Sequence, residues 1–249
     1  MNWLKKRWWI IVIGLLAVMV IGFIAWGLVI PAPMPEALEA LQTGPEVSVT
    51  TEPWLVFQPA GSTATTGLIF YPGGRVDPRA YAPMAYEIAS QGYLVVIVPM
   101  PLNLAVFGSG TAASVIEAYP EIENWVIGGH SLGGSMAAAY ADKHDDQIDG
   151  LVLMASYPAG SNSLVENDLS VSSIFATQDG LATGDKISAS RELLPVGTTW
   201  VQVDGGNHAQ FGWYGEQSGD LPASISREEQ QAQVIQATLE LLKQVEQNP

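Results

Sequence analysis

A serine lies between two glycines in Gly129-His130-Ser131-Leu132-Gly133, which joins an apolar run, Trp125–Gly129, to a helix-like stretch, Leu132–Lys143. A serine on such a strand-to-helix turn has crowded backbone around it, so glycine is favoured two residues before and two residues after it. The free N–H groups at the start of the helix also stabilise developing negative charge. The segment therefore predicts that Ser131 is a catalytic nucleophile rather than an incidental residue of a glycine-rich turn.

A serine hydroxyl is a weak nucleophile and needs a neighbouring base. His208 is the predicted base because it closely follows another apolar run, Thr199–Val203. Of the two other histidines, His144 lies at the far end of the helix that begins after the serine, roughly 20 Å away at the rise of an α-helix. His130 occupies the turn itself, so neither is favoured.

An imidazole base needs a carboxylate that fixes its tautomer and stabilises its charged form. Asp179 is the predicted carboxylate, since it follows the apolar run Ser173–Ala176 and gives the chain order Ser, Asp, His. Asp185 and Asp204 are the alternatives. Asp185 has the position of a helix-start residue, and Asp204 lies only four residues before the histidine.

Acyl transfer also needs N–H donors that bind the oxyanion. We expect one donor to be the backbone N–H of Leu132, directly after the nucleophile. The second is expected in the loop after the apolar run Leu68–Tyr71. Because Pro72 has no N–H, this donor is Gly73 or Gly74, although a plain type II turn explains the two glycines nearly as well.

These candidate residues require a scaffold that brings the ends of separate strands together. Most of the apolar runs are short and almost continuously hydrophobic, as expected for strands buried on both faces of a sheet. The expected strands are Val47–Thr50, Trp54–Gln58, Leu68–Tyr71, Leu94–Pro99, Trp125–Gly129, Leu151–Ala155, Ser173–Ala176 and Thr199–Val203. The expected helices are Tyr81–Gln91, Thr111–Ala118, Leu132–Lys143, Lys186–Leu194 and Arg227–Gln247. The alternation predicts an α/β fold with a mainly parallel sheet of about eight strands flanked by helices.

Together, Gly129–Gly133, the loop Tyr71–Arg75, Asp179 and His208 resemble the α/β-hydrolase superfamily. The chain is most similar to the small, lidless branch of esterase-like and dienelactone-hydrolase-like members, and the resemblance covers most of the chain after the apolar leader. It implies the α/β-hydrolase fold and a serine hydrolase that acts through an acyl-enzyme. It also implies that the reaction uses no metal and no organic cofactor.

The chain departs from these relatives at two points. Many members carry His-Gly where this chain has Tyr71-Pro72, and dienelactone hydrolases use a Cys nucleophile, whereas this chain has no cysteine. Only about 17 residues separate Ala155 from Ser173, where hydrolases with a helical cap insert it. We therefore expect no large cap domain and an open site.

Two groups of residues near the predicted site have alternative interpretations. Three aromatic residues after the predicted base either line an apolar acyl pocket or pack in the core: Phe211, Trp213 and Tyr214. Arg75 and Arg79 flank the predicted oxyanion loop. They either attract an anionic substrate or, as is more common, pair with nearby carboxylates.

The N-terminal leader predicts a membrane anchor. Residues 8–30 contain no charged side chain and follow Lys5-Lys6-Arg7. As a helix, 23 residues reach roughly 34 Å, enough to cross a hydrocarbon core of about 30 Å. A cleaved signal peptide has an apolar stretch of only about 7–15 residues, so an uncleaved anchor is favoured. The basic cluster predicts a single-pass cell-membrane protein with a cytoplasmic N-terminus and an extracytoplasmic catalytic domain.

The charge balance and the lack of cysteine argue against several classes of binding partner and bound group. Three of the ten Lys and Arg residues precede residue 8, whereas all 25 Asp and Glu residues follow residue 30, so the rest of the chain carries a formal charge of −18. Nucleic acids and anionic lipids are bound through clustered positive charge, and this balance argues against both. The absence of cysteine excludes disulfides and thiolate metal sites.

The expected organisation is an anchor over residues 1–30, a linker over 31–45 and an α/β-hydrolase domain over 46–249. The expected function is cleavage of a carboxylic ester, or a related acyl bond, of a small molecule. The alternative is a membrane-tethered binding module that keeps the fold without catalysis.

Overall fold

The structure is a computed structural model that describes residues 2–247, with the side chains of residues 8–247. The side chains of the basic cluster Lys5-Lys6-Arg7 therefore lie outside the described residues.

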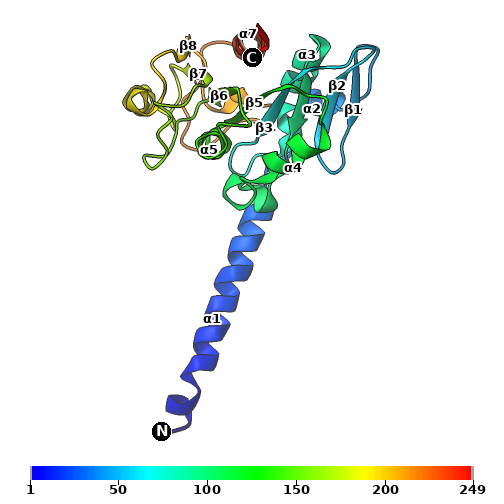
Figure 1. Ribbon diagram of the computed structural model, residues 1–249. Coiled ribbons are helices and arrows are strands. Elements are labelled where there is room, and N and C mark those ends of the chain that lie inside the picture. The colour runs from blue at the N-terminus through cyan, green and yellow to red at the C-terminus, as the bar shows by residue number, and fades with distance from the viewer. Residues whose placement is uncertain (1, 248–249) are drawn as a thin grey trace.

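A sheet of eight strands forms the centre of the domain, in the order β1-β2-β4-β3-β5-β6-β7-β8 (Figure 1). The strands are β1 (Val47–Thr50), β2 (Leu55–Pro59), β3 (Thr66–Tyr71), β4 (Leu94–Ile97), β5 (Asn124–His130), β6 (Gly150–Met154), β7 (Ser170–Ala176) and β8 (Thr199–Val203). β2 pairs antiparallel with β1 and β4, and all other neighbours are parallel. This is the mainly parallel sheet that the sequence predicts.

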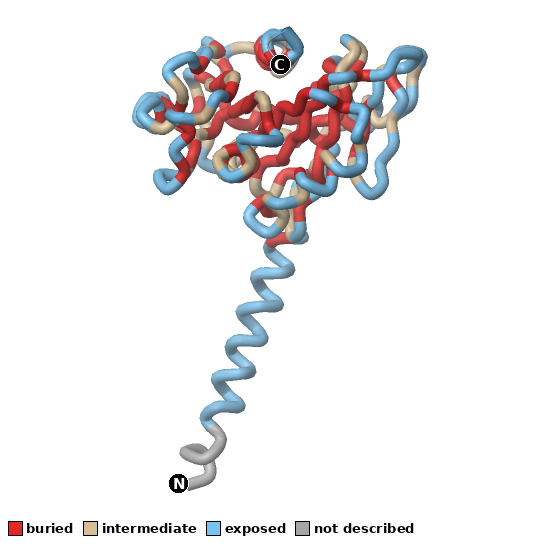
Figure 2. Tube along the Cα trace, in the orientation of Figure 1, coloured by how far each residue is buried: buried red, intermediate tan, exposed pale blue. Residues whose placement is uncertain are grey.

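Helices cover both faces of the sheet, which explains why the strands are apolar throughout. The helices of the domain are α2 (Pro35–Glu39), α3 (Ala82–Ser90), α4 (Thr111–Ala118), α5 (Leu132–Ala141), α6 (Gly184–Ala189) and α7 (Arg227–Gln247). In β3, Leu68 and Phe70 belong to the core layer beneath α3 and α7, whereas Ile69 and Tyr71 belong to the layer that α4 and α5 cover. All four side chains are fully buried, as Figure 2 shows for the central strands in general.

The parallel strands place the candidate residues at one edge of the sheet. β5, β7 and β8 run parallel through a continuous register, so their carboxyl ends lie side by side. Ser131 directly follows β5, Asp179 follows β7 and His208 follows β8. The loop after β3 reaches the same edge because β3 is parallel to β5.

Most predicted boundaries agree with the structure to within a few residues. The predicted strand Leu94–Pro99 ends at Ile97, and the predicted helix Lys186–Leu194 is α6 followed by a 3-10 turn over Ser190–Leu193. Residues 155–169, between β6 and β7, contain no helix in the described chain. The absence of a large cap is therefore confirmed.

The start of α7 carries a capping box. The backbone N–H of Ser226 donates to Glu229 Oε2 at 2.8 Å, and the N–H of Glu229 donates to Ser226 Oγ at 3.1 Å. The pair satisfies two of the amides that every helix start leaves without a partner, which fixes where α7 begins.

The leader forms a separate long helix, α1 (Asn2–Leu28), that stands away from the domain (Figure 1). Trp8–Leu28 is long and apolar enough to cross a membrane, with a mean hydropathy of 2.7 and only 6% of it buried. The segment after it is packed rather than free: the N–H of Met34 donates to the carbonyl of Trp213 at 2.8 Å, and Ala37 in α2 is fully buried.

Candidate active site

Ser131 lies on a strained turn between β5 and α5. Its φ of 52° places it in the left-handed region, which is unfavourable for a residue with a side chain. A Cβ atom on Gly129 would lie 2.5 Å from the carbonyl oxygen of Tyr71, and one on Gly133 would collide with the backbone of Tyr71 and Pro72. Both glycines are therefore required for the backbone to make this turn beside the end of β3.

Two hydrogen bonds fix the strained residue. The N–H of Ser131 donates to the carbonyl of Met154 at 2.9 Å, and Ser156 Oγ donates to the carbonyl of Ser131 at 2.6 Å. These bonds hold the N–H and the carbonyl group of Ser131 in place, and Ser131 lines a pocket.

Asp179 and His208 are in direct contact. Asp179 Oδ2 and His208 Nδ1 are 2.8 Å apart, and both residues are almost fully buried. The other carboxylate oxygen, Oδ1, accepts the N–H groups of Leu181 and Ala182, each at 2.7 Å. Three donors thus orient the carboxylate toward the imidazole.

This contact determines which nitrogen of His208 is available. An ionised carboxylate can only accept, so Nδ1 carries the proton and Nε2 keeps a free lone pair. Nε2 is buried and has no hydrogen-bond partner within residues 8–247. A neutral imidazole in this tautomer can accept a proton from a hydroxyl group.

Ser131 and His208 line the same pocket, of about 270 Å³. Its other walls include Leu132, Ala155, Tyr157 and Leu181. The pocket is partly open to solvent, in agreement with the expectation of an uncapped site. The structure therefore brings together the serine, the imidazole and the carboxylate that the sequence singled out.

Asp220 is a further residue at the site that the sequence analysis missed. Its Oδ1 accepts the N–H of Gly180, next to Asp179, at 3.0 Å, and its Oδ2 accepts the N–H of Ala209, next to His208, at 2.8 Å. One carboxylate therefore holds together the two loops that carry Asp179 and His208. No local pattern around residue 220 indicates this role.

The alternative acids and bases lie elsewhere. Asp185 is exposed in the first turn of α6, and Asp204 is exposed and accepts a hydrogen bond from Gln202. His144 stacks on Tyr140 near the end of α5, with ring centroids 4.2 Å apart. Among these candidates, Asp179 is the one in contact with His208.

The two candidate donors in the loop after β3 differ in their hydrogen bonds. The N–H of Gly73 donates to Tyr81 Oη at 3.0 Å, whereas the N–H of Gly74 makes no hydrogen bond in the described part of the chain. A Cβ atom on Gly74 would lie 3.2 Å from Leu132 Cδ2, so the two residues are neighbours. The N–H of Leu132, at the start of α5, also has no partner among the described residues.

His130 is held as a neutral ring beneath His208. Tyr81 Oη accepts the N–H of Gly73 and lies 2.9 Å from His130 Nδ1, within hydrogen-bond distance of that nitrogen. Burial, and to a lesser degree the nearby His208, lower the pKa of His130 well below its usual value. The ring centroids of the two histidines are 4.5 Å apart.

The aromatic residues after His208 pack in the interior. Phe211 stacks on His130 with centroids 5.7 Å apart, and Tyr214 lies 6.3 Å from the same ring. Phe211, Trp213 and Tyr214 are all buried, and none lines the pocket beside Ser131. Of the two interpretations, packing in the core and not lining of an acyl pocket therefore applies to these three residues.

Neither arginine beside the predicted oxyanion loop is free for an anionic substrate. Arg79 forms a bidentate ion pair with Asp77, with distances of 2.8 and 2.6 Å, and this hydrogen bonding raises the pKa of the guanidinium. Arg75 binds the end of α1 instead: its Nε donates to the carbonyl of Trp26 at 3.0 Å and its Nη2 to that of Val29 at 2.8 Å. Its guanidinium also lies over the indole of Trp26, at 4.4 Å.

Comparison with known proteins places the chain in a family. Residues 67–232, about two thirds of the chain, match the Alpha/beta hydrolase family. The chain belongs to the α/β-hydrolase family. This membership confirms the resemblance drawn from the sequence and supports a hydrolase activity. No curated protein matches the chain.

Similar solved structures have the same fold at low sequence identity. A dienelactone hydrolase from Anabaena variabilis has a TM-score of 0.60 and 15% identity, over 80% of this chain and 96% of that one. A predicted CIB-like hydrolase from Thermoplasma acidophilum has a TM-score of 0.60 and 13% identity, over 80% and 98%. Est1E from Butyrivibrio proteoclasticus has a TM-score of 0.57 and 11% identity, over 80% and 99%. These α/β-hydrolases share the architecture of the sheet and its helices.

Within the described residues, no group of three or more His, Asp or Glu side chains is placed to hold a metal ion. The residues with polar side chains that line the pocket are Ser131, Ser135, Ser156, Tyr157 and His208.

Proposed function

We propose that this protein is a serine hydrolase that cleaves carboxylic esters through Ser131, His208 and Asp179. The observation that carries the proposal is the contact of 2.8 Å between Asp179 and His208, because it leaves Nε2 without a partner among the described residues, and His208 lines the pocket that the strained Ser131 also lines. Buried carboxylate–imidazole pairs of this kind hold the base in the tautomer that a serine nucleophile requires.

In the proposed reaction, His208 Nε2 takes the hydroxyl proton while Ser131 Oγ bonds to the ester carbonyl carbon. The N–H groups of Leu132 and Gly74 bind the resulting oxyanion, since neither has a partner among the described residues and a Cβ atom on Gly74 would lie 3.2 Å from Leu132 Cδ2. Collapse of the tetrahedral intermediate expels the alcohol, which receives the proton from Nε2 and leaves an acyl-enzyme. Water then attacks the acyl group, with His208 again taking the proton, and the acid is released as Ser131 regains its hydrogen.

The size of the pocket favours a short acyl group. A volume of about 270 Å³ is at the small end of ligand pockets, and no cap extends it in the described chain. Structural neighbours are named as an esterase domain, as lipolytic enzymes and as a dienelactone hydrolase, which supports acyl-bond hydrolysis without fixing the substrate. We expect p-nitrophenyl acetate and butyrate to be cleaved faster than longer esters.

We also propose that residues 1–30, which include α1, form an uncleaved membrane anchor, followed by the packed segment 31–45 and the hydrolase domain 46–249. The bonds of Arg75 to Trp26 and Val29 support retention of the helix, since cleavage after it would leave this guanidinium without its partners. Lys5, Lys6 and Arg7 support a cytoplasmic N-terminus, which places the domain on the opposite side of the membrane.

A fluorophosphonate probe tests the catalytic assignment on the full chain in mild detergent. The wild-type protein is expected to be labelled, and Ser131→Ala is expected to abolish both labelling and ester hydrolysis. Ser135→Ala is the matched control, because Ser135 lines the same pocket but donates to the carbonyl of Tyr157 at 2.6 Å. Labelling that persists in Ser131→Ala would assign the reaction to another serine, and an unlabelled but folded wild type would indicate a non-catalytic binding module.

A further inference from the structure

The loop of residues 101–108, which follows β4, lies against the candidate active site. It contains two 3-10 turns, η2 (Pro101–Asn103) and η3 (Ala105–Phe107). The N–H of Arg75 donates to the carbonyl of Asn103 at 2.7 Å, and a Cβ atom on Gly74 would lie 3.8 Å from Leu104 Cδ2. η3 also packs on α5, the helix that begins directly after Ser131.

The same loop holds the end of α1. Asn103 Nδ2 donates to the carbonyl of Gly27 at 2.9 Å. Gly27 is the one buried residue of α1 in the described chain, and a Cβ atom there would lie 3.0 Å from both Cβ and the carbonyl oxygen of Leu102. Gly74 and Arg75 are consecutive, with Cα atoms about 3.8 Å apart. The proposed oxyanion donor is therefore next to the residue that binds the end of the membrane helix.

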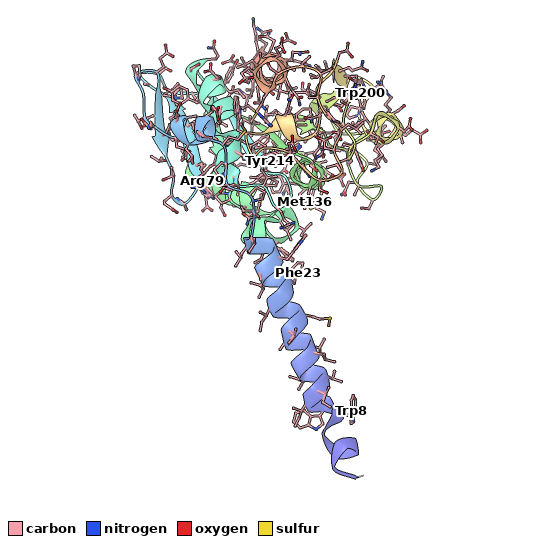
Figure 3. All side chains as sticks on the ribbon, turned by 180° about the vertical axis from the view of Figure 1, so that it is seen from behind. Trp8, Phe23, Arg79, Met136, Trp200 and Tyr214 are labelled. Carbon is pink, nitrogen blue, oxygen red and sulfur yellow. The ribbon has the colours of Figure 1, made fainter. Side chains whose placement is uncertain are left out.

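Phe107 lies at the depth of the membrane helix. Its ring contacts Phe23 edge to face, with centroids 6.2 Å apart. Phe23 is five residues before the end of α1, or about 7 Å along the helix axis, and Figure 3 shows it near the domain end of α1, with Trp8 toward the other end. A side chain that touches Phe23 is therefore level with the hydrophobic span and not with the aqueous phase beyond it.

The tip of the loop is unusually apolar for an exposed segment. Phe107 is 52% exposed and Val106 is 47% exposed. In the described chain, Phe107 is the one exposed Phe or Trp outside α1. An exposed aromatic beside an apolar helix is typical of contact with a lipid bilayer.

We propose that the 101–108 loop inserts Val106 and Phe107 into the bilayer beside α1, and that the enzyme thereby hydrolyses short-chain esters of alcohols that reside in that bilayer. The inference rests on the proposed ester hydrolysis and on the proposed anchor. The short acyl group enters the pocket of about 270 Å³ beside Ser131, while the long apolar part of the alcohol stays among the lipid chains. Water supplies the hydroxyl of the released acid, and the alcohol keeps its oxygen and stays in the membrane.

The charge of the domain favours an apolar contact over an electrostatic one. With 25 acidic residues against seven basic ones after the leader, the domain is repelled by anionic lipid surfaces. Zwitterionic phosphatidylcholine should therefore suffice for insertion of the loop.

The depth of the loop is measured first, without reference to activity. The chain has no cysteine, so Phe107→Cys and Val196→Cys each introduce one labelling site. Val196 is fully exposed before β8, at the amino edge of the sheet, and is the matched control. In full-length protein in phosphatidylcholine nanodiscs, an NBD fluorophore at position 107 is expected to be blue-shifted and quenched by spin-labelled lipids, whereas one at position 196 should be neither. Equal behaviour at the two positions would overturn the insertion.

The route of the substrate is measured with two esters, p-nitrophenyl acetate in water and 1-O-hexadecyl-2-acetylglycerol in the nanodisc. Phe107→Ser is expected to lower hydrolysis of the bilayer ester at least about fivefold, because a buried phenyl group contributes one to two orders of magnitude to membrane partitioning. Its hydrolysis of the soluble ester should stay within about twofold of wild type, since residue 107 does not line the pocket. Val196→Ser should change neither rate.

The outcomes separate the inference from the function on which it rests. Equal rates of Phe107→Ser and wild type on the bilayer ester would overturn entry of the substrate from the membrane, even if the soluble ester is cleaved. Failure of the wild type on both esters would overturn the proposed hydrolase, and the fluorescence result would still decide whether the loop is inserted.

Discussion

At the scale of single residues, the carboxylate of Asp179 fixes the tautomer of His208, on which the proposed role of this residue as a base depends. Its Oδ1 is occupied by two backbone N–H groups, so only Oδ2 is left for the imidazole. An amide in place of the carboxylate can present its NH₂ group to Nδ1, which would favour the tautomer with its proton on Nε2. That tautomer cannot accept the hydroxyl proton of the serine.

We therefore expect Asp179→Asn to lower kcat by about 10³–10⁴-fold while the KM for p-nitrophenyl acetate changes little. Steady-state kinetics at pH 7 to 8 measures both constants. Asp185→Asn is the matched control, because it removes an exposed carboxylate in α6 and should leave kcat unchanged. A loss of less than tenfold in Asp179→Asn would mean that this carboxylate does not orient the base.

His130 makes the stability of the fold depend on pH. In the folded protein its pKa lies well below the usual value, because the ring is buried and faces His208. In the unfolded chain it binds a proton near pH 6.5. The contribution of the neutral ring to stability is therefore fully present above about pH 6.5 and is progressively lost as the pH falls below that value.

We expect the free energy of unfolding to fall between pH 7.5 and 5.5, and His130→Gln to reduce that fall by about 1 kcal/mol. Urea unfolding of the full chain in mild detergent measures the difference at the two pH values. His144→Gln controls for the loss of an imidazole near the half-buried end of α5. The same pH dependence in His130→Gln and wild type would contradict the proposed cause.

Ser131, Asp179 and His208 could be predicted from the sequence because each follows an apolar strand, and parallel strands bring their carboxyl ends together. Tyr81 and Asp220 were missed for a physical reason. Tyr81 acts from the start of α3 by reaching back to Gly73, and Asp220 lies in an irregular segment. Hydrogen bonds between loops follow from tertiary packing, and no periodicity in the chain encodes them.

At the scale of elements, the turn between β5 and α5 is set by the close approach of three backbones. The glycines of this turn lie against the end of β3, where a Cβ atom on Gly133 would overlap the carbonyl oxygens of Tyr71 and Pro72. Backbone atoms cannot move away as the end of a flexible side chain can. A single methyl group must therefore displace either α5 or the oxyanion loop.

We expect Gly133→Ala to destabilise the fold by about 3 kcal/mol and to abolish ester hydrolysis. Thermal unfolding of the full chain in detergent, with fluorophosphonate labelling, measures both effects. Gly184→Ala is the control, since a Cβ atom at that position meets nothing within 4 Å. A stable and active Gly133→Ala variant would show that the turn can relax more than its contacts imply.

Element types were predictable from the sequence, whereas some ends were not. The apolar run Leu68–Tyr71 within β3 follows from burial on both faces of the sheet, and it identified this strand. The strand Leu94–Pro99 was predicted too long, because pairing with β2 and β3 stops at Ile97. The pattern of apolar residues indicates which residues are buried, but it does not indicate where the hydrogen-bonded pairing between strands ends.

At the scale of the whole molecule, α1 is joined to the domain by a specific contact and not by a free linker. Gly27 permits this contact, because a larger residue would collide with Leu102. Gly22, one and a half turns earlier, faces open space. Gly22 and Gly27, two of the glycines of α1, therefore offer a matched pair for testing the joint.

We expect Gly27→Val to broaden the distribution of distances between spin labels at residues 18 and 196, because it separates α1 from the 101–108 loop. Gly22→Val should leave the distribution narrow. Double electron–electron resonance on Val18→Cys, Val196→Cys protein in nanodiscs measures both. An equally narrow distribution in Gly27→Val would show that the joint does not depend on this close approach.

The fixed joint also limits the space that the proposed membrane-anchored hydrolase can sample. An enzyme on a long flexible stalk samples a volume of solution. The hydrogen bonds of Arg75 and Asn103 to the end of α1 instead hold this domain at a fixed position relative to the helix, so that it stays close to the membrane that α1 is proposed to span. Encounters are then governed by lateral diffusion in two dimensions. Its turnover should follow the mole fraction of ester among the lipids and not the total amount of ester per litre.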